Sequence, residues 1–113
     1  MEKVTQLKKQ LRKYLQDWVD YHPDEQTGVP LSVVESESDG HFFLLEYGQG
    51  TEGWVHFLMV HLQVTDTGKI VLLQNNTDIE PLRELEEYGV MPKDLTIGWA
   101  TEKKVGTEQQ KAA

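Results

Sequence analysis

Apolar residues in the first twenty positions recur at steps of three and four, the spacing of one face of an α-helix. The pattern ends at His22-Pro23, because proline cannot continue a helix. It predicts an amphipathic helix over residues 2–21, about 30 Å long at 1.5 Å per residue. The apolar stripe consists of Val4, Leu7, Leu11, Tyr14, Leu15, Trp18 and Val19.

After this helix the chain alternates between short runs rich in leucine, β-branched and aromatic residues and turns that contain glycine. Runs of this kind, separated by tight turns, are typical of consecutive antiparallel strands. The pattern therefore predicts a β-meander of about four strands. The predicted strands are 31–36, 41–47, 54–64 and 69–74, with turns at 38–40, 48–53 and 65–68.

The next segment is typical of a short helix. Thr77 and Glu80 have the spacing of a capping box, and Pro81 suits the first turn of a helix. Gly89 is expected to end this helix in a left-handed conformation. Residues 95–99 are expected to form a final short strand. Together, the two helices and the antiparallel strands make α+β the expected fold class.

The longest predicted strand, 54–64, is apolar on both of its faces if side chains alternate strictly. One helix cannot cover both faces of a sheet, so a second helix or a second subunit has to cover the other face. A homodimer formed through the sheet is one prediction from this pattern. Alternation places Trp54, Leu58, Val60, Leu62 and Val64 on one face and Val55, Phe57 and Met59 on the other.

The length of 113 residues suits one domain, which we place at residues 1–100, followed by a polar and flexible tail at 101–113. The absence of cysteine excludes disulfides, cysteine-ligated zinc and a thiol nucleophile. The longest apolar runs have four residues, far short of a membrane span, and the first twenty residues are too charged for a signal peptide. We therefore expect a cytoplasmic protein.

The net charge of −8 is unevenly distributed. Five of the eleven basic residues lie in the first thirteen positions, whereas between Tyr14 and Glu102 three basic residues oppose seventeen acidic ones, a net −14. Such a body repels DNA phosphates over about 8 Å at physiological salt, so direct DNA binding is disfavoured. It would attract a basic protein partner, although solubility alone also explains the charge.

The histidines are the only residues that invite a metal or acid–base hypothesis. His56 and His61 are five positions apart, so strict alternation places them on opposite faces of one strand. His41 would lie across the sheet, close to one of them. No HExxH, GxSxG or phosphate-loop motif is present. We therefore predict no catalytic residue, no metal site and no cofactor. A small metal-dependent enzyme built on the histidines is the least favoured hypothesis.

Two motif-rich stretches, 61–78 and 79–99, closely resemble the XisI family, the fdxN element excision controlling factors of cyanobacteria. The resemblance covers residues 1–100. It is sharpest in the His-Leu-x-Val strand from His61, the Asp-x-Gly-Lys-Ile turn from Asp66, the Asn-Thr-Asp segment from Asn76 and the Leu-x-x-x-Gly-Val-x-Pro-x-Asp-Leu step from Leu85.

This resemblance implies an accessory protein without catalytic activity, associated with programmed excision of a DNA element during heterocyst differentiation. Family members act with a XisH-like partner that resembles nuclease folds, while a separate recombinase, XisF, performs the strand chemistry. The expected effect on DNA recombination is therefore indirect. Whether the partner is activated or inhibited stays open.

The charge pattern and the resemblance together give two site hypotheses. In the first, acidic residues bind the basic XisH-like partner; the candidates are Glu35, Glu37, Asp39, Glu84, Glu86 and Glu87. In the alternative, the N-terminal helix contacts DNA phosphates; the candidates are Lys8, Lys9, Arg12 and Lys13.

Overall fold

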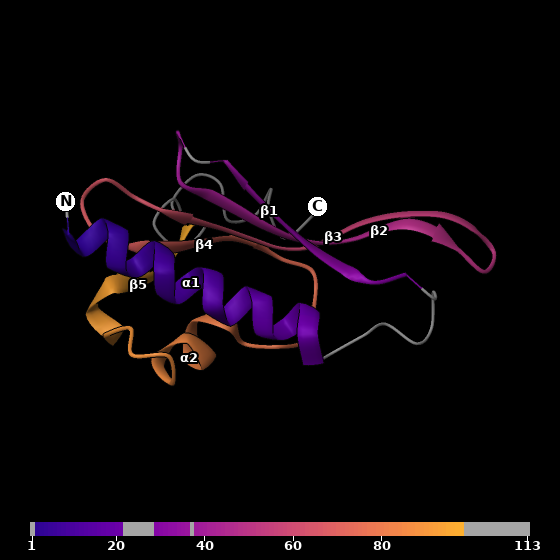
Figure 1. Cartoon of the computed structure of the whole chain (residues 1–113). Coiled ribbons are helices and arrows are strands. Elements are labelled where there is room, and N and C mark those ends of the chain that lie inside the picture. Colours follow the sequence, from indigo (N-terminus) through magenta and orange to yellow (C-terminus); the bar gives the residue numbers. More distant parts are fainter. Residues whose placement is uncertain (1, 22–28, 37, 99–113) are drawn as a thin grey trace, which may run out of the picture.

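The computed structural model describes residues 2–21, 29–36 and 38–98, and within them it confirms the α+β class (Figure 1). The predicted tail at 101–113 and Trp99, the last residue of the predicted final strand, lie outside these residues. The elements are α1 (Glu2–Tyr21), β1 (Leu31–Ser36), β2 (His41–Gly50), β3 (Gly53–Val64), β4 (Ile70–Asn75), α2 (Pro81–Glu86), the 3₁₀ turn η1 (Pro92–Asp94) and β5 (Leu95–Ile97).

The strands form one sheet in the order β1-β2-β3-β4-β5. The pairs β1–β2, β2–β3 and β3–β4 are antiparallel, which confirms the predicted meander. β5 is parallel to β4, with Ile70 beside Leu95, because α2 and η1 return the chain to the end at which β4 began. The final strand is thus real, with Leu95–Ile97 as its described extent.

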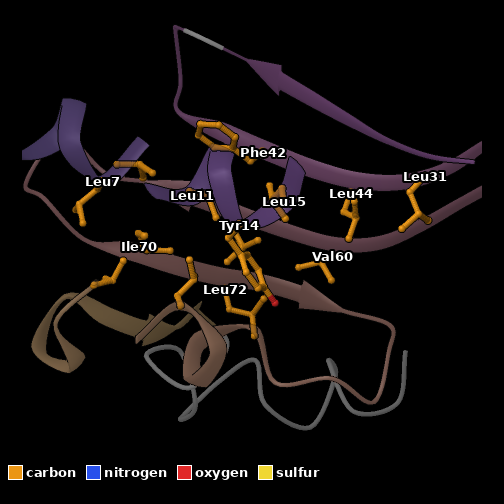
Figure 2. Packing of buried hydrophobic residues seen from close by; sticks show 14 residues of the cluster. Leu7, Leu11, Tyr14, Leu15, Leu31, Phe42, Leu44, Val60, Ile70 and Leu72 are labelled. Atoms are coloured by element: carbon orange, nitrogen blue, oxygen red, sulfur yellow. The ribbon is translucent and has the colours of Figure 1, made fainter. Parts of the chain in front are cut away.

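Helix α1 lies across one face of this sheet (Figure 1). Its predicted stripe supplies Leu11 and Leu15, both without exposed surface, which point at Phe42 and Leu44 of β2 and at the neighbouring strands (Figure 2). Burial of such side chains is the main favourable contribution to folding. Neither α-helix of the described chain is long and apolar enough to cross a membrane.

The turn between β1 and β2 requires glycine at position 40. Gly40 has a φ of 72°, its N–H donates to the Ser36 carbonyl at 2.9 Å, and its own carbonyl accepts from the Val64 N–H at 2.8 Å. A Cβ at this position would collide with the Val64 carbonyl oxygen. The turn therefore fixes the start of β2 against the end of β3.

A β-bulge interrupts β3 at Met59. Leu44 pairs with Val60 but Leu45 pairs with Leu58, so Met59 is an extra residue on the β3 side. Such a bulge shifts the alternation of side chains by one position. The strict alternation predicted for this strand is therefore wrong: Trp54 and Leu58 face the side of the sheet opposite Val60, Leu62 and Val64.

The predicted capping box is also wrong, because α2 begins at Pro81 with Glu80 before it and has no side-chain cap bond. Asn75 organises the preceding loop instead. Its Oδ1 accepts from the Thr77 N–H at 3.0 Å, its Nδ2 donates to the Ile79 carbonyl at 2.9 Å, and the Thr77 hydroxyl accepts from the Ile79 N–H. Competition from these local bonds delays the helix.

The predicted end of α2 is confirmed. Gly89 has a φ of 94° and its N–H donates to the Glu86 carbonyl, while the Val90 N–H donates to the Leu85 carbonyl at 3.3 Å. These two bonds satisfy carbonyls that the helix end leaves open.

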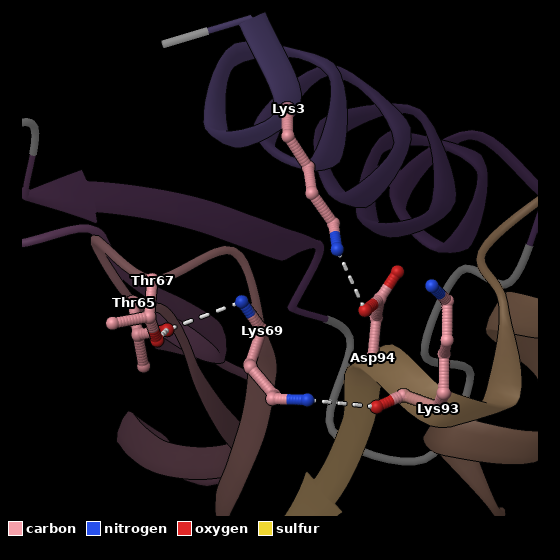
Figure 3. A network of polar contacts seen from close by, with 6 residues as sticks. All are labelled: Lys3, Thr65, Thr67, Lys69, Lys93 and Asp94. Atoms are coloured by element: carbon pink, nitrogen blue, oxygen red, sulfur yellow. Dashed lines mark hydrogen bonds and ion pairs between the residues drawn. The ribbon is translucent and has the colours of Figure 1, made fainter.

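A buried carboxylate anchors the N-terminal end of α1 to η1 (Figure 3). Asp94, with 4% of its surface exposed, accepts from the Lys3 ammonium at 2.9 Å. Beside it, the Lys69 ammonium donates to the Lys93 carbonyl at 3.0 Å. The Lys3 ammonium holds the pKa of Asp94 below its ordinary value of 3.8. The pair therefore ties the first turn of the chain to the turn that precedes β5.

The central helix contact predicts a large effect of Leu11→Ala. Truncation of a leucine with no exposed surface leaves a cavity and should lower the free energy of unfolding by about 2–5 kcal/mol. Urea unfolding followed by circular dichroism measures this. Gln6→Ala, on the exposed face of the same helix, should change the stability by less than about 0.5 kcal/mol. Equal effects of the two variants would contradict the packing described here.

The Asp94 pair predicts a specific dependence of stability on pH. A carboxyl with a lowered folded pKa stabilises the fold above its unfolded pKa, near 3.8, and loses that contribution as the pH falls through the folded value. Asp94→Asn should therefore lower the midpoint of urea unfolding at pH 6. It should also make the midpoints at pH 6 and pH 3 more alike than they are in the wild type. An unchanged midpoint at pH 6 would show that the pair of Lys3 and Asp94 does not stabilise the fold.

Candidate protein-binding surfaces

Two of the predicted site residues neutralise each other. The Arg12 guanidinium donates to both carboxylate oxygens of Glu35, with Nε to Oε1 at 2.8 Å and Nη2 to Oε2 at 2.7 Å. Arg12, with a further contribution from Lys8, holds the pKa of Glu35 below its ordinary value. The contact joins the candidate phosphate-binding helix to the candidate acidic set, on the flank of α1 that faces β1.

The remaining basic candidates lie along the outer side of α1. The Lys13 ammonium pairs with Asp17 at 3.1 Å, one helical turn away. Lys9 is exposed and Lys8 is partly exposed. Phosphate binding by this helix would therefore have to compete with Glu35 for Arg12 and with Asp17 for Lys13.

The acidic candidates fall on both flanks of α1. Glu84 accepts from the Tyr14 hydroxyl at 2.6 Å. Tyr14 is two residues after Arg12, about 200° around a helix of 3.6 residues per turn, so Glu84 and Glu35 lie on opposite flanks. Four further candidates remain. Glu86 and Glu87 are exposed on and just after α2, Asp39 is exposed in the β1–β2 turn, and Glu37 lies outside the described residues.

A cleft of about 400 Å³ separates α1 from α2. Its walls combine aromatic rings with carboxylates from both helices. The Tyr88 hydroxyl donates to Asp17 at 2.6 Å, and the rings of Tyr14 and Tyr88 meet edge to face at 5.4 Å. The lining residues are Tyr14, Asp17, Trp18, Tyr21, Ile79, Glu84, Glu87 and Tyr88.

The titration behaviour of the cleft keeps its hydroxyls neutral and its Asp17 charged. Burial and the bond to Glu84 raise the pKa of Tyr14, and the bond to Asp17 raises that of Tyr88 to about 12. The Tyr88 hydroxyl, followed by Lys13, holds the pKa of Asp17 below its ordinary value. Aromatic faces beside carboxylates favour a cationic side chain. We name this site the acidic–aromatic cleft.

Sequence reasoning identified Glu84 and Glu87 but missed Asp17 as part of this site. The available signal was the helical spacing of Tyr14, Asp17 and Tyr21, which places all three on one flank of α1. Their meeting with Tyr88 depends on a contact between residues more than seventy positions apart, which no local pattern reveals.

The side of the sheet opposite α1 is chemically different, and we name it the neutral face. In the described strands, pairing and the Met59 bulge place sixteen side chains there, and none of them is charged. They are Ser32, Val34, Ser36, His41, Phe43, Leu45, Tyr47, Gln49, Trp54, His56, Leu58, His61, Gln63, Val71, Gln74 and Thr96.

The three histidines of the described residues, His41, His56 and His61, lie on this face. Because of the bulge, His56 and His61 share it, so their predicted placement on opposite faces is wrong. The expected proximity of His41 is confirmed, since its Nδ1 lies 2.8 Å from Nε2 of His61. The Phe43 ring stacks on His61 at 4.3 Å. Within the described residues, no three histidine, aspartate or glutamate side chains gather as metal ligands would.

The fold and these surfaces define a small α+β protein with one helix across a five-stranded sheet. More particularly, the chain belongs to the XisI family, because the family model described as XisI protein matches residues 1–109. This confirms the resemblance found in the sequence. No functionally curated protein matches the chain.

Two crystal structures share the fold. A XisI-like protein from Anabaena variabilis ATCC 29413 is 24% identical, with 84% of this chain and 85% of that chain covered and a TM-score of 0.70. The fdxN element excision controlling factor XisI from the same organism is 18% identical, with 86% of each chain covered and a TM-score of 0.64. At these identities the likeness shows a common fold.

The contact between His41 and His61 predicts a lowered pKa for His61 and a loss of stability in acid. Burial, followed by the charge of His41, lowers the pKa of His61 from its ordinary 6.5. Below pH 6.5 the unfolded chain therefore takes up a proton that the folded His61 resists, and stability falls as the pH decreases toward the folded pKa. In an NMR titration, His61 should have a midpoint below 6.5, and His41→Gln should move it partly back. A midpoint at or above 6.5 in the native protein would contradict this.

Proposed function

We propose that this protein is a non-enzymatic accessory protein that binds a basic, XisH-like partner of nuclease fold. Through this partner it controls site-specific DNA excision by a separate recombinase. Membership of the XisI family supports the proposal. So does the description of one relative with the same fold as an fdxN element excision controlling factor.

The observation that carries the proposal is the acidic–aromatic cleft. Its carboxylates and rings are presented side by side by α1 and α2, and Glu86 and Glu87 add exposed negative charge at its edge. An arginine or lysine side chain of a partner would gain both ring and carboxylate contacts there. The net −14 between residues 14 and 102 would speed the encounter with a basic protein.

The same chemistry suggests how binding controls the partner. A nuclease-fold protein holds DNA through cations that contact phosphates. An acidic surface competes with phosphates for those cations. Occupation of the cleft by such a cation would therefore exclude DNA from that part of the partner's surface.

The alternative, a DNA-contacting subunit, receives less support from the contacts of α1. Of its four candidate cations, Arg12 and Lys13 are held by carboxylates of this chain. Lys8 and Lys9, which form no ion pair with a carboxylate of the described residues, would give weak DNA binding with a shallow dependence on salt.

Charge reversal at the edge of the cleft tests the proposal. With a co-purified XisH-like partner at 50 mM salt, Glu86→Lys combined with Glu87→Lys should weaken binding by about tenfold or more, as expected when two contacts of about 1 kcal/mol become repulsive. The wild-type affinity should also fall with added salt. Isothermal titration calorimetry measures both effects.

Asp66→Lys, at an exposed turn between β3 and β4, is the control for that experiment; it makes the same change of charge as one of the two reversals, so it is compared with Glu86→Lys alone as well as with the double variant. It should reduce the affinity far less than the double reversal at α2. Equal losses would contradict the cleft as the binding site. Failure to bind the partner, together with a DNA gel shift that disappears when Lys8, Lys9, Arg12 and Lys13 become Gln, would assign the function to α1.

A further inference from the structure

The β2–β3 hairpin continues beyond the rest of the sheet. β1 pairs with β2 only as far as Glu46, and β4 pairs with β3 only from Val60. We call the ribbon between these points, residues 47–58, the arm. It projects past the C-terminal end of α1, and within the described chain no third strand pairs with either of its edges (Figure 1).

The arm exposes large apolar side chains on both of its faces. Tyr47 is 50% exposed and Trp54 61% on one face, while Phe57 is 44% exposed on the other. The ring of Tyr47 packs edge to face on Trp54 at 5.3 Å. A two-stranded ribbon is marginally stable in water on its own. Because this one exposes large aromatic side chains, it would gain stability if another protein surface packed against them.

One face of the arm is continuous with the neutral face. Tyr47 and Trp54 lie on the same side as Val34, which is 47% exposed on the edge strand β1. Phe43 and Leu45 connect them across β2. The result is a strip of apolar and uncharged polar side chains from the edge of the sheet to the tip of the arm, in a chain of which 27% is charged.

We propose that a second copy of this chain packs on the neutral face, with the arm of each copy reaching across the other. Two copies with a net charge of −8 each repel one another over most of their surface. The neutral face is where they can approach without bringing carboxylates together or removing charges from water. A twofold arrangement places this patch on both sides of the contact and covers both arms at once.

A basic partner has no reason to select the neutral face, because the described strands offer it no carboxylate there. Self-association is therefore independent of the proposed function, and the two differ in their response to salt. Partner binding through the acidic–aromatic cleft should weaken as salt is added. Association through the neutral face should not weaken with added salt, since apolar burial drives it and salt screens the repulsion between the two negatively charged copies.

Sedimentation velocity on the full chain tests this proposal between 1 and 100 μM protein, at 50 and 500 mM salt. The expected mass is twice the 13.0 kDa of one chain, with a dissociation constant that is no higher at 500 mM salt than at 50 mM. A mass of 13.0 kDa at 100 μM would overturn the proposal and assign the neutral face to another segment of the chain or to a different protein.

Surface variants locate the contact. Val34→Lys and Trp54→Lys place charges in the neutral face and should each weaken the dimer at least tenfold. Met91→Lys, at a 56% exposed apolar residue just before η1, is the matched control and should leave the dimer unchanged. All three sites are exposed, so native circular dichroism spectra are expected. A dimer equally sensitive to all three variants, or to Met91→Lys alone, would overturn the location.

Discussion

The rest of the structure depends on one contact, the burial of a single apolar stripe of α1 on one face of the sheet. Leu11 and Leu15 lose all exposure there. Once the stripe is buried, the two flanks of the helix can only point along the sheet. Arg12 then meets Glu35 on the β1 side, and Tyr14 meets Glu84 on the α2 side. The helix that forms the core therefore also positions the polar contacts around it.

The same contact accounts for the difference between the two surfaces of the protein. Since α1 covers one face only, charges and aromatic residues gather where its flank meets α2, while the opposite face of the sheet keeps apolar and uncharged side chains. These surfaces favour different occupants. Binding of a cation in a charged cleft weakens as the ionic strength rises, whereas packing of a neutral apolar strip on a similar surface does not weaken. One small domain could in this way hold two different partners at once.

The sequence predicted the elements well because their signals are local. The 3.6-residue period gave α1 its bounds, and glycine turns delimited the strands to within a few residues. The motifs around His61 and Gly89 predicted the XisI family, which the family model confirmed. The position of each turn was predictable because glycine conformations such as that of Gly40 are available to few other residues.

Two of the failures share a physical cause, which is that contacts between distant segments of the chain decided the outcome. The Met59 bulge has no signature in its own sequence, yet it reversed half of β3 and brought His56 and His61 to one face. The missing helix cap has a different, local cause, because the Asn75 side chain accepts a hydrogen bond from Thr77 two positions away and competes with the cap. The acidic–aromatic cleft joins Asp17 to Tyr88 across seventy-one positions, so spacing along the chain could not reveal it.

The central claim is that the neutral face and the acidic–aromatic cleft are separate and can be occupied together. The mass of the complex with the XisH-like partner, measured by light scattering at 50 and 500 mM salt, tests this most directly. The account predicts two copies of each protein at low salt and, at high salt, release of the partner from a dimer that persists. A complex with one copy of each protein at low salt would contradict it, because partner and second copy would then compete for one surface.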